Sequence, residues 1–72
     1  MKPKWNPRLP AILELGIRYR AEGSPYFLNK SDGGYTVQNT RTGIDTPFTR
    51  LIDALEFVAL AVRHIAEVKL PA

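Results

Sequence analysis

The chain has no cysteine among its 72 residues. That absence removes disulfides, thiolate metal sites and cysteine nucleophiles at once, and it is typical of a reducing compartment. The sequence also lacks any apolar run near the roughly 20 residues that a membrane-spanning helix requires. We therefore expect an intracellular protein without a membrane segment. A chain of this length forms one small domain whose core leaves little margin of stability.

Acidic residues are missing from the first ten positions, MKPKWNPRLP, which hold three prolines, three basic residues and the only tryptophan. Prolines lack an N–H donor and fix φ, so this stretch cannot form a regular helix or a central strand. We predict a flexible, extended, basic arm at residues 1–10 and a single α+β domain at residues 11–72.

Basic charge is concentrated in the first part of the chain. Residues 1–30 hold six basic and two acidic residues, a net charge of +4, whereas residues 31–72 carry a net charge of −1. This asymmetry suggests that the N-terminal half approaches an anionic partner, either nucleic acid or an acidic protein surface. The alternative is a tail that is kept soluble by its charge.

Apolar residues alternate with charged residues or glycine from Leu13 to Arg20. A period of two predicts a strand with one buried face, and it places Arg18 and Arg20 together on the solvent face. A helix that begins near Pro10 is the competing interpretation of residues 12–20, because proline is favoured at the first helical position.

Two β-rich segments, Tyr26–Lys30 and Tyr35–Asn39, flank the sequence SDGG. Aspartate and glycine tolerate the positive φ of tight turns, so this pattern predicts a β-hairpin. A second turn is expected at residues 40–43. Residues 44–48 can return as a short edge segment, where Pro47 prevents complete ladder bonding.

A long amphipathic helix is expected from about Arg50 to Lys69, with Thr49 as its N-cap. Helical spacing places five apolar residues on one stripe, and acidic and basic residues lie on the opposite side. The predicted fold is α+β, with an antiparallel sheet of about three strands packed against this one C-terminal helix. The stripe consists of Leu51, Leu55, Val58, Val62 and Ile65.

Residues that could carry chemistry are few. His64 is the only histidine, and it has neither a cysteine nor a second histidine at ligand spacing. No serine or pair of carboxylates is placed to form a catalytic triad with it. We therefore expect a non-enzymatic protein with no cofactor and no metal site. Phe57 and Leu60 interrupt the polar side of the helix. They form either a partner-docking patch or a pair of residues that the arm or the sheet covers.

Aromatic residues in the predicted strands alternate with basic ones, which is compatible with a stacking surface for single-stranded nucleic acid. Strand alternation must send about half of these rings into the core, so core filling is the default interpretation. An exposed sheet edge that pairs with an extended peptide is a further possibility. The aromatic residues concerned are Tyr26, Phe27, Tyr35 and Phe48.

Two local resemblances accompany these patterns. The run Asp32–Val37, followed by a helix that contains Asp53–Glu56, resembles the hairpin-to-helix passage of HicB-type antitoxins. That resemblance implies an antitoxin-like inhibitor. The order of strand, turn, strand and helix is similar to the arm-type DNA-binding domains of phage integrases.

Over its full length the chain resembles a small phage-encoded transcription regulator that binds bacterial RNA polymerase. The resemblance lies in the succession of MKPKWNPRLP, LELGIRYR, SDGGYTV and a single helix. It implies a non-enzymatic ligand of the N-terminal region of the polymerase β′ subunit, acting in the cytoplasm of the bacterial host. Such a protein inhibits σ-dependent initiation and lets elongating polymerase read through terminators.

The residues predicted to contact a partner are basic or large and apolar, because tryptophan and arginine dominate interface energetics when desolvated. We expect a monomer that uses them for protein–protein contact, with direct nucleic-acid binding as the alternative. Trp5→Ala, or charge reversal at Arg18, is expected to weaken polymerase binding without unfolding the domain. The predicted partner-binding residues are Trp5, Arg8, Arg18, Arg20, Phe57 and Leu60.

Overall fold

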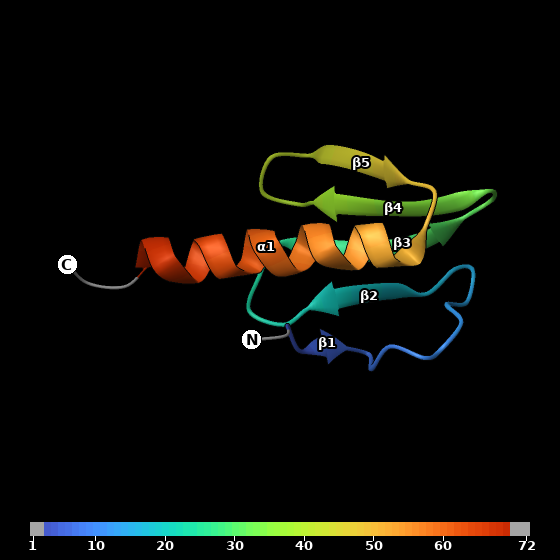
Figure 1. The fold of residues 1–72 in the computed structure, drawn as a ribbon, viewed down its shortest axis with the longest axis horizontal. Helices are drawn as coiled ribbons and strands as arrows, with labels where there is room; N and C mark the ends of the chain where they lie inside the picture. Colours follow the sequence, from blue (N-terminus) through green and yellow to red (C-terminus); the bar gives the residue numbers. More distant parts are fainter. Residues whose placement is uncertain (1–2, 70–72) are drawn as a thin grey trace.

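The computed structural model describes residues 3–69, with side chains through residue 64. It is one antiparallel sheet crossed by one long helix (Figure 1). The α+β class and the C-terminal helix are confirmed, but the sheet has five strands and not about three. The strands are adjacent in chain order. The elements are β1 Trp5–Asn6, β2 Arg18–Ala21, β3 Tyr26–Ser31, β4 Gly34–Asn39, β5 Ile44–Phe48 and α1 Leu51–Lys69.

Strand β1 comes from the segment that the sequence presents as an arm. Trp5 pairs with Ala21 of β2, and Asn6 pairs with Arg20. The Glu22 amide also donates to the Lys4 carbonyl at 2.7 Å. The residues between the prolines at positions 3 and 7 keep their N–H donors, so they can pair with β2 while the prolines limit the strand to two residues. Residues 5–6 are thus extended, as predicted, but they belong to the sheet.

Residues 13–17 form neither the predicted strand nor the alternative helix. The Ile17 amide donates to the Glu14 carbonyl at 3.4 Å, and Gly16 has a φ of 84°. That turn interrupts the alternation, because Leu15 is 61% exposed although it was expected on the buried face with Leu13. The strand therefore begins only at Arg18.

The predicted β3–β4 hairpin and the second turn expected at residues 40–43 are both confirmed. The β3–β4 connection has two residues, Asp32 and Gly33, and Gly33 has a positive φ, 81°, which glycine adopts without steric cost. In the β4–β5 turn the Gly43 amide donates to the Asn39 carbonyl at 2.7 Å. Strand β5 lies at the edge of the sheet, which is where a strand tolerates Pro47.

The core lies between the sheet and α1. Tyr19, Leu28 and Val37 are cross-strand neighbours on β2, β3 and β4, and all three are buried. Ala54 and Val58 of the helix are completely buried against this face. The small alanine lets the helix backbone approach the sheet closely. Leu13 completes the core from the loop before β2.

Helix α1 begins at Leu51, one residue later than predicted, and the Arg50 carbonyl accepts the Ala54 amide at 3.3 Å. Thr49 therefore lies outside the helix, one residue before the position that an N-cap occupies. Four of the five predicted stripe residues pack in or against the core, whereas the side chain of the fifth lies outside the described residues. The four are Leu51, Leu55, Val58 and Val62.

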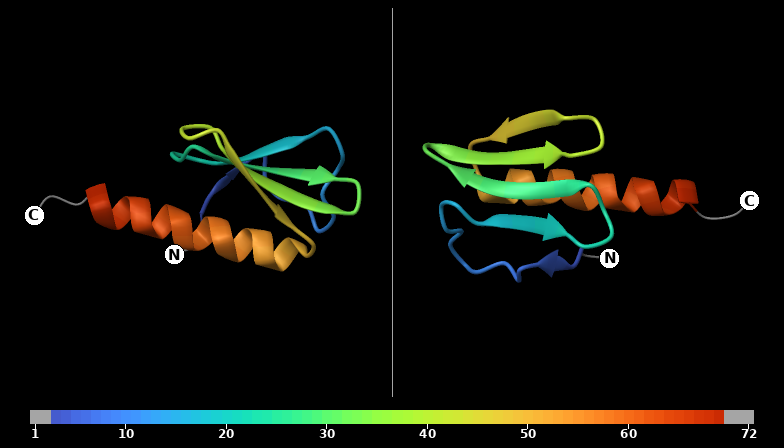
Figure 2. Two further views of the ribbon diagram at one scale, coloured as in Figure 1. Left: turned by 90° about the horizontal axis from the view of Figure 1, so that it is seen from above. Right: turned by 180° about the vertical axis from the view of Figure 1, so that it is seen from behind.

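The helix covers only one face of the sheet (Figure 2). No described element lies over the other, which we call the open face. Strand pairing and the alternation of side chains assign its residues. Its two principal rows are Asn6–Arg20–Phe27–Gln38–Asp45 and Arg18–Asn29–Thr36–Pro47.

Candidate partner-binding surfaces

The open face holds two exposed arginines, Arg18 and Arg20, on the same side of β2. Period-two alternation predicts this arrangement, and the pairing register confirms that both side chains lie opposite the helix-covered face. Arg20 is directly opposite Phe27 of β3, and Arg18 lies diagonally from the same ring. Cross-strand and diagonal neighbours of this kind are within reach of long side chains.

Arg18 is held in place by two contacts. Its guanidinium carbon lies 4.1 Å from the centroid of the Phe27 ring, a cation–π contact. Its Nη2 donates to Oε1 of Gln38 on β4 at 2.6 Å. The side chain thus spans β3 and presents a fixed guanidinium above the sheet. The alternation in the sequence predicts the face on which Arg18 lies, but not its contact with the phenyl ring.

The side chain of Arg20 makes no hydrogen bond or ion pair with any residue in the described part of the chain. The charged residue on its row is Asp45, which lies three strands away on β5. At a strand spacing of about 4.8 Å this is a separation of about 14 Å, beyond the screening length at physiological salt. A nearer carboxylate, that of Glu22, lies 3.9 Å from the Lys4 ammonium. Within the described residues, no ion pair therefore compensates the charges of Arg18 and Arg20.

A second surface lies between the N-terminal segment and the helix. This N-terminal groove has a volume of about 380 Å³ and is predominantly apolar. One wall is the segment around β1, and the other is the outer side of the first half of α1. Ile52 is 56% exposed in it, and Glu56 is the only charged residue among the described residues that line it. The groove is lined by Pro3, Trp5, Leu9, Ile52, Leu55, Glu56 and Ala59.

The predicted partner-binding residues do not gather on one surface. Arg18 and Arg20 lie on the open face, whereas Trp5 is half-buried against the core and lines the N-terminal groove. Arg8 is exposed and borders a separate hollow beside the loop before β2. The sheet separates the two arginines of β2 from the helix residues.

Phe57 and Leu60 of the helix differ from one another. The Phe57 ring packs against Tyr26 at a centroid distance of 6.3 Å and against Phe48 at 5.3 Å. The sheet therefore covers part of Phe57, which is the alternative that the sequence left open. Leu60 remains 66% exposed. Ile52 was missed because its neighbours on the helical stripe made it resemble an ordinary core-flanking residue.

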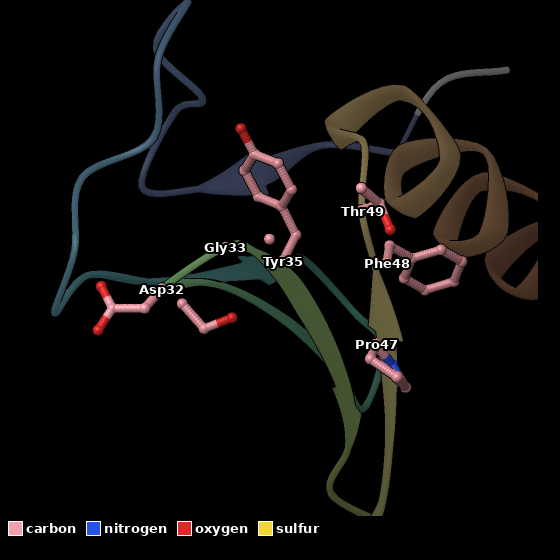
Figure 3. A pocket seen from close by; sticks show the side chains of 8 residues that line it. Asp32, Gly33, Tyr35, Pro47, Phe48 and Thr49 are labelled. Carbon is pink, nitrogen blue, oxygen red and sulfur yellow. The ribbon is translucent and has the colours of Figure 1, made fainter.

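A third hollow, of about 290 Å³, lies where the β3–β4 turn meets the end of β5. Figure 3 shows Asp32 directed away from the rings of Tyr35 and Phe48, which lie on either side of the β5 chain end. No basic side chain lines this hollow, so the glycine pair at its rim does not form an anion cradle.

Two further features bear on the chemistry. Among the side chains described, those of residues 3–64, no three histidine, cysteine or acidic groups are gathered as metal ligands. Within residues 3–69, the helix is not apolar and long enough to cross a bilayer. No protein-family model, curated protein or solved structure matches the chain.

Proposed function

We propose that this chain is a non-enzymatic phage protein that binds bacterial RNA polymerase at the N-terminal region of the β′ subunit. In this proposal it acts in the host cytoplasm as a monomer, inhibits initiation and suppresses termination. The whole-chain resemblance described above supplies the identity of the partner. The N-terminal groove is the structural observation that supports protein–protein contact.

The groove has the properties of a site for apolar anchor residues. An apolar cavity of about 150 Å³ holds one benzene molecule, so about 380 Å³ accommodates about two side chains of that size. Burying an exposed isoleucine such as Ile52 contributes on the order of 1 kcal/mol to association. Glu56, the one carboxylate in the groove, favours a partner segment with a basic residue beside its apolar anchor.

Ile52→Glu is the variant that tests the groove. Ile52 is exposed, so its replacement removes apolar contact area and adds a second carboxylate without disturbing the core. We expect binding to purified polymerase core enzyme, measured by biolayer interferometry, to weaken by about tenfold or more, equivalent to about 1.4 kcal/mol. Inhibition of initiation and terminator read-through in a purified transcription assay should weaken in parallel.

Ile44→Glu is the matched control. Ile44 is also exposed, at 62%, but it lies on β5 at the opposite edge of the sheet. We expect this variant to bind polymerase like the unmodified protein. Absence of polymerase from a tagged-protein pull-down, analysed by mass spectrometry, would contradict the partner. Equal effects of the two variants would contradict the groove as the contact surface.

A further inference from the structure

We propose that the open face of the sheet binds single-stranded nucleic acid, with Arg18 as a stacking platform for a base and Arg20 as a phosphate contact. This site is separate from the N-terminal groove, because the sheet lies between the open face and the helix. The inference therefore does not depend on the proposed polymerase contact.

Arg18 is prepared for stacking by its two contacts. The Phe27 ring covers one side of its guanidinium, and Gln38 accepts one of its five N–H donors. No described element lies over the opposite side (Figure 2). Unstacked bases pack on arginine planes in single-strand recognition. Because the plane is already ordered, binding loses little side-chain entropy.

Arg20 supplies the electrostatic part of the site. It lies two residues from Arg18 on the same face and has no ion-pair partner among the described residues. If a base stacks on Arg18, the adjoining phosphate therefore lies close enough to the Arg20 guanidinium to be attracted by its charge. In the adjacent row, Asn29 and Thr36 add polar groups that can bond to base edges or sugars.

The composition of the open face favours nucleic acid over an acidic protein. Protein interfaces have an apolar core. Here the one aromatic side chain, Phe27, is already covered by Arg18 and half-buried, and its cross-strand neighbours on either side, Arg20 and Gln38, are polar. Nucleic-acid interfaces are instead polar and strongly positive. No described helix projects from the open face (Figure 2), so the face has no helix to enter the major groove of a duplex, which favours a single strand.

The test is fluorescence anisotropy of the full chain with labelled 12-nucleotide oligouridylate and oligothymidylate. One phosphate contact, at Arg20, gives a log–log salt slope of about −0.7 for a single strand, so affinity should fall about two- to threefold between about 50 and 200 mM salt. Arg18→Lys keeps the charge but loses the plane, and we expect about tenfold weaker binding with an unchanged slope. Arg20→Gln should reduce the slope by about 0.7.

Arg63→Gln is the control, since it removes one positive charge from the helix, on the other side of the sheet. Its effect on affinity should be less than twofold, and circular dichroism should show that all variants are folded. The proposal is overturned if Arg63→Gln weakens binding as much as the β2 variants do. It is also overturned if neither oligonucleotide binds, or if duplex DNA or oligoglutamate binds more tightly than both.

Discussion

Gly34, the first residue of β4, is at a position where the backbone of β5 leaves no room for a side chain. A Cβ atom there would lie 2.5 Å from the Phe48 carbonyl oxygen. Because that atom belongs to the backbone of a paired strand, relief requires movement of the β4–β5 pair. We expect Gly34→Ala to lower the free energy of unfolding by about 1–3 kcal/mol, as overpacking does elsewhere.

Urea denaturation measures this effect, with Ser31→Ala as the control. Ser31 belongs to the same hairpin but is exposed, and its side chain has no hydrogen-bond partner in the described part of the chain. Its removal should change the free energy of unfolding by less than about 0.5 kcal/mol. A Gly34→Ala protein as stable as the unmodified chain would contradict the close approach.

Asp53 and Arg50 form a bidentate pair at the start of the helix. Arg50 Nε donates to Oδ2 at 2.9 Å, and Nη2 donates to Oδ1 at 3.0 Å. The hydrogen bond from Arg50, with a smaller contribution from its charge, lowers the pKa of Asp53, although desolvation opposes the change. A lowered folded-state pKa stabilises the protein above the unfolded-state pKa, and this contribution is lost as the pH falls through the folded-state value.

We therefore expect Asp53→Asn to be slightly less stable than the unmodified protein near pH 7. The difference should shrink as the pH falls from about 5 to about 2, because protonation of the carboxyl group then removes the same interaction. Thermal unfolding at a series of pH values measures the difference. Arg50→Gln should reproduce the same pH dependence, and a difference that stays constant with pH would exclude the ion pair as its cause.

At the scale of elements, β1 links the N-terminal segment to the core. Trp5 is half-buried and packs against the core cluster while its backbone pairs with Ala21. Truncation of a large buried aromatic residue costs about 3–5 kcal/mol, so for a half-buried one we expect Trp5→Ala to cost about 2 kcal/mol. Chemical denaturation should show this loss, and Trp5→Phe should retain most of the stability.

This expectation changes the meaning of the Trp5→Ala experiment. The sequence suggested a variant that would lose binding and keep its fold, because an aromatic residue between prolines resembles a free anchor. The structure gives Trp5 a packing role as well. A loss of binding in Trp5→Ala alone would therefore mix two effects, whereas Ile52→Glu separates them. A Trp5→Ala protein of unchanged stability would contradict the packing role.

The elements that the sequence predicted well are those fixed by local signals. The β3–β4 turn is fixed by Gly33, and the helix is fixed by a stripe that repeats over several turns. The end of the loop, residues 13–17, was predicted as a strand because its apolar residues alternate. These residues pair with no other strand, so the alternation there does not produce a strand. Strand β1 was missed because two residues show no periodicity. Strand β1 forms because its backbone pairs with β2. A tertiary contact of that kind leaves no signal in the local sequence.

At the scale of the whole molecule, the sheet divides the surface into two chemically different parts. The helix side carries an apolar groove with one carboxylate, and the open face carries two arginines and a covered phenyl ring. The sequence predicted the shared face of Arg18 and Arg20 from alternation alone. It could not predict the groove, because the two walls lie nearly 50 residues apart in the chain and meet only in the fold.

Both edges of the sheet are interrupted by proline. Strand β1 ends after two residues at Pro7, and β5 contains Pro47. A long uninterrupted edge would recruit other copies into fibrils that grow by successive strand addition. The missing donors make each edge a poor template for that growth. The same prolines thus lower the tendency of this sheet to grow by strand addition from another copy.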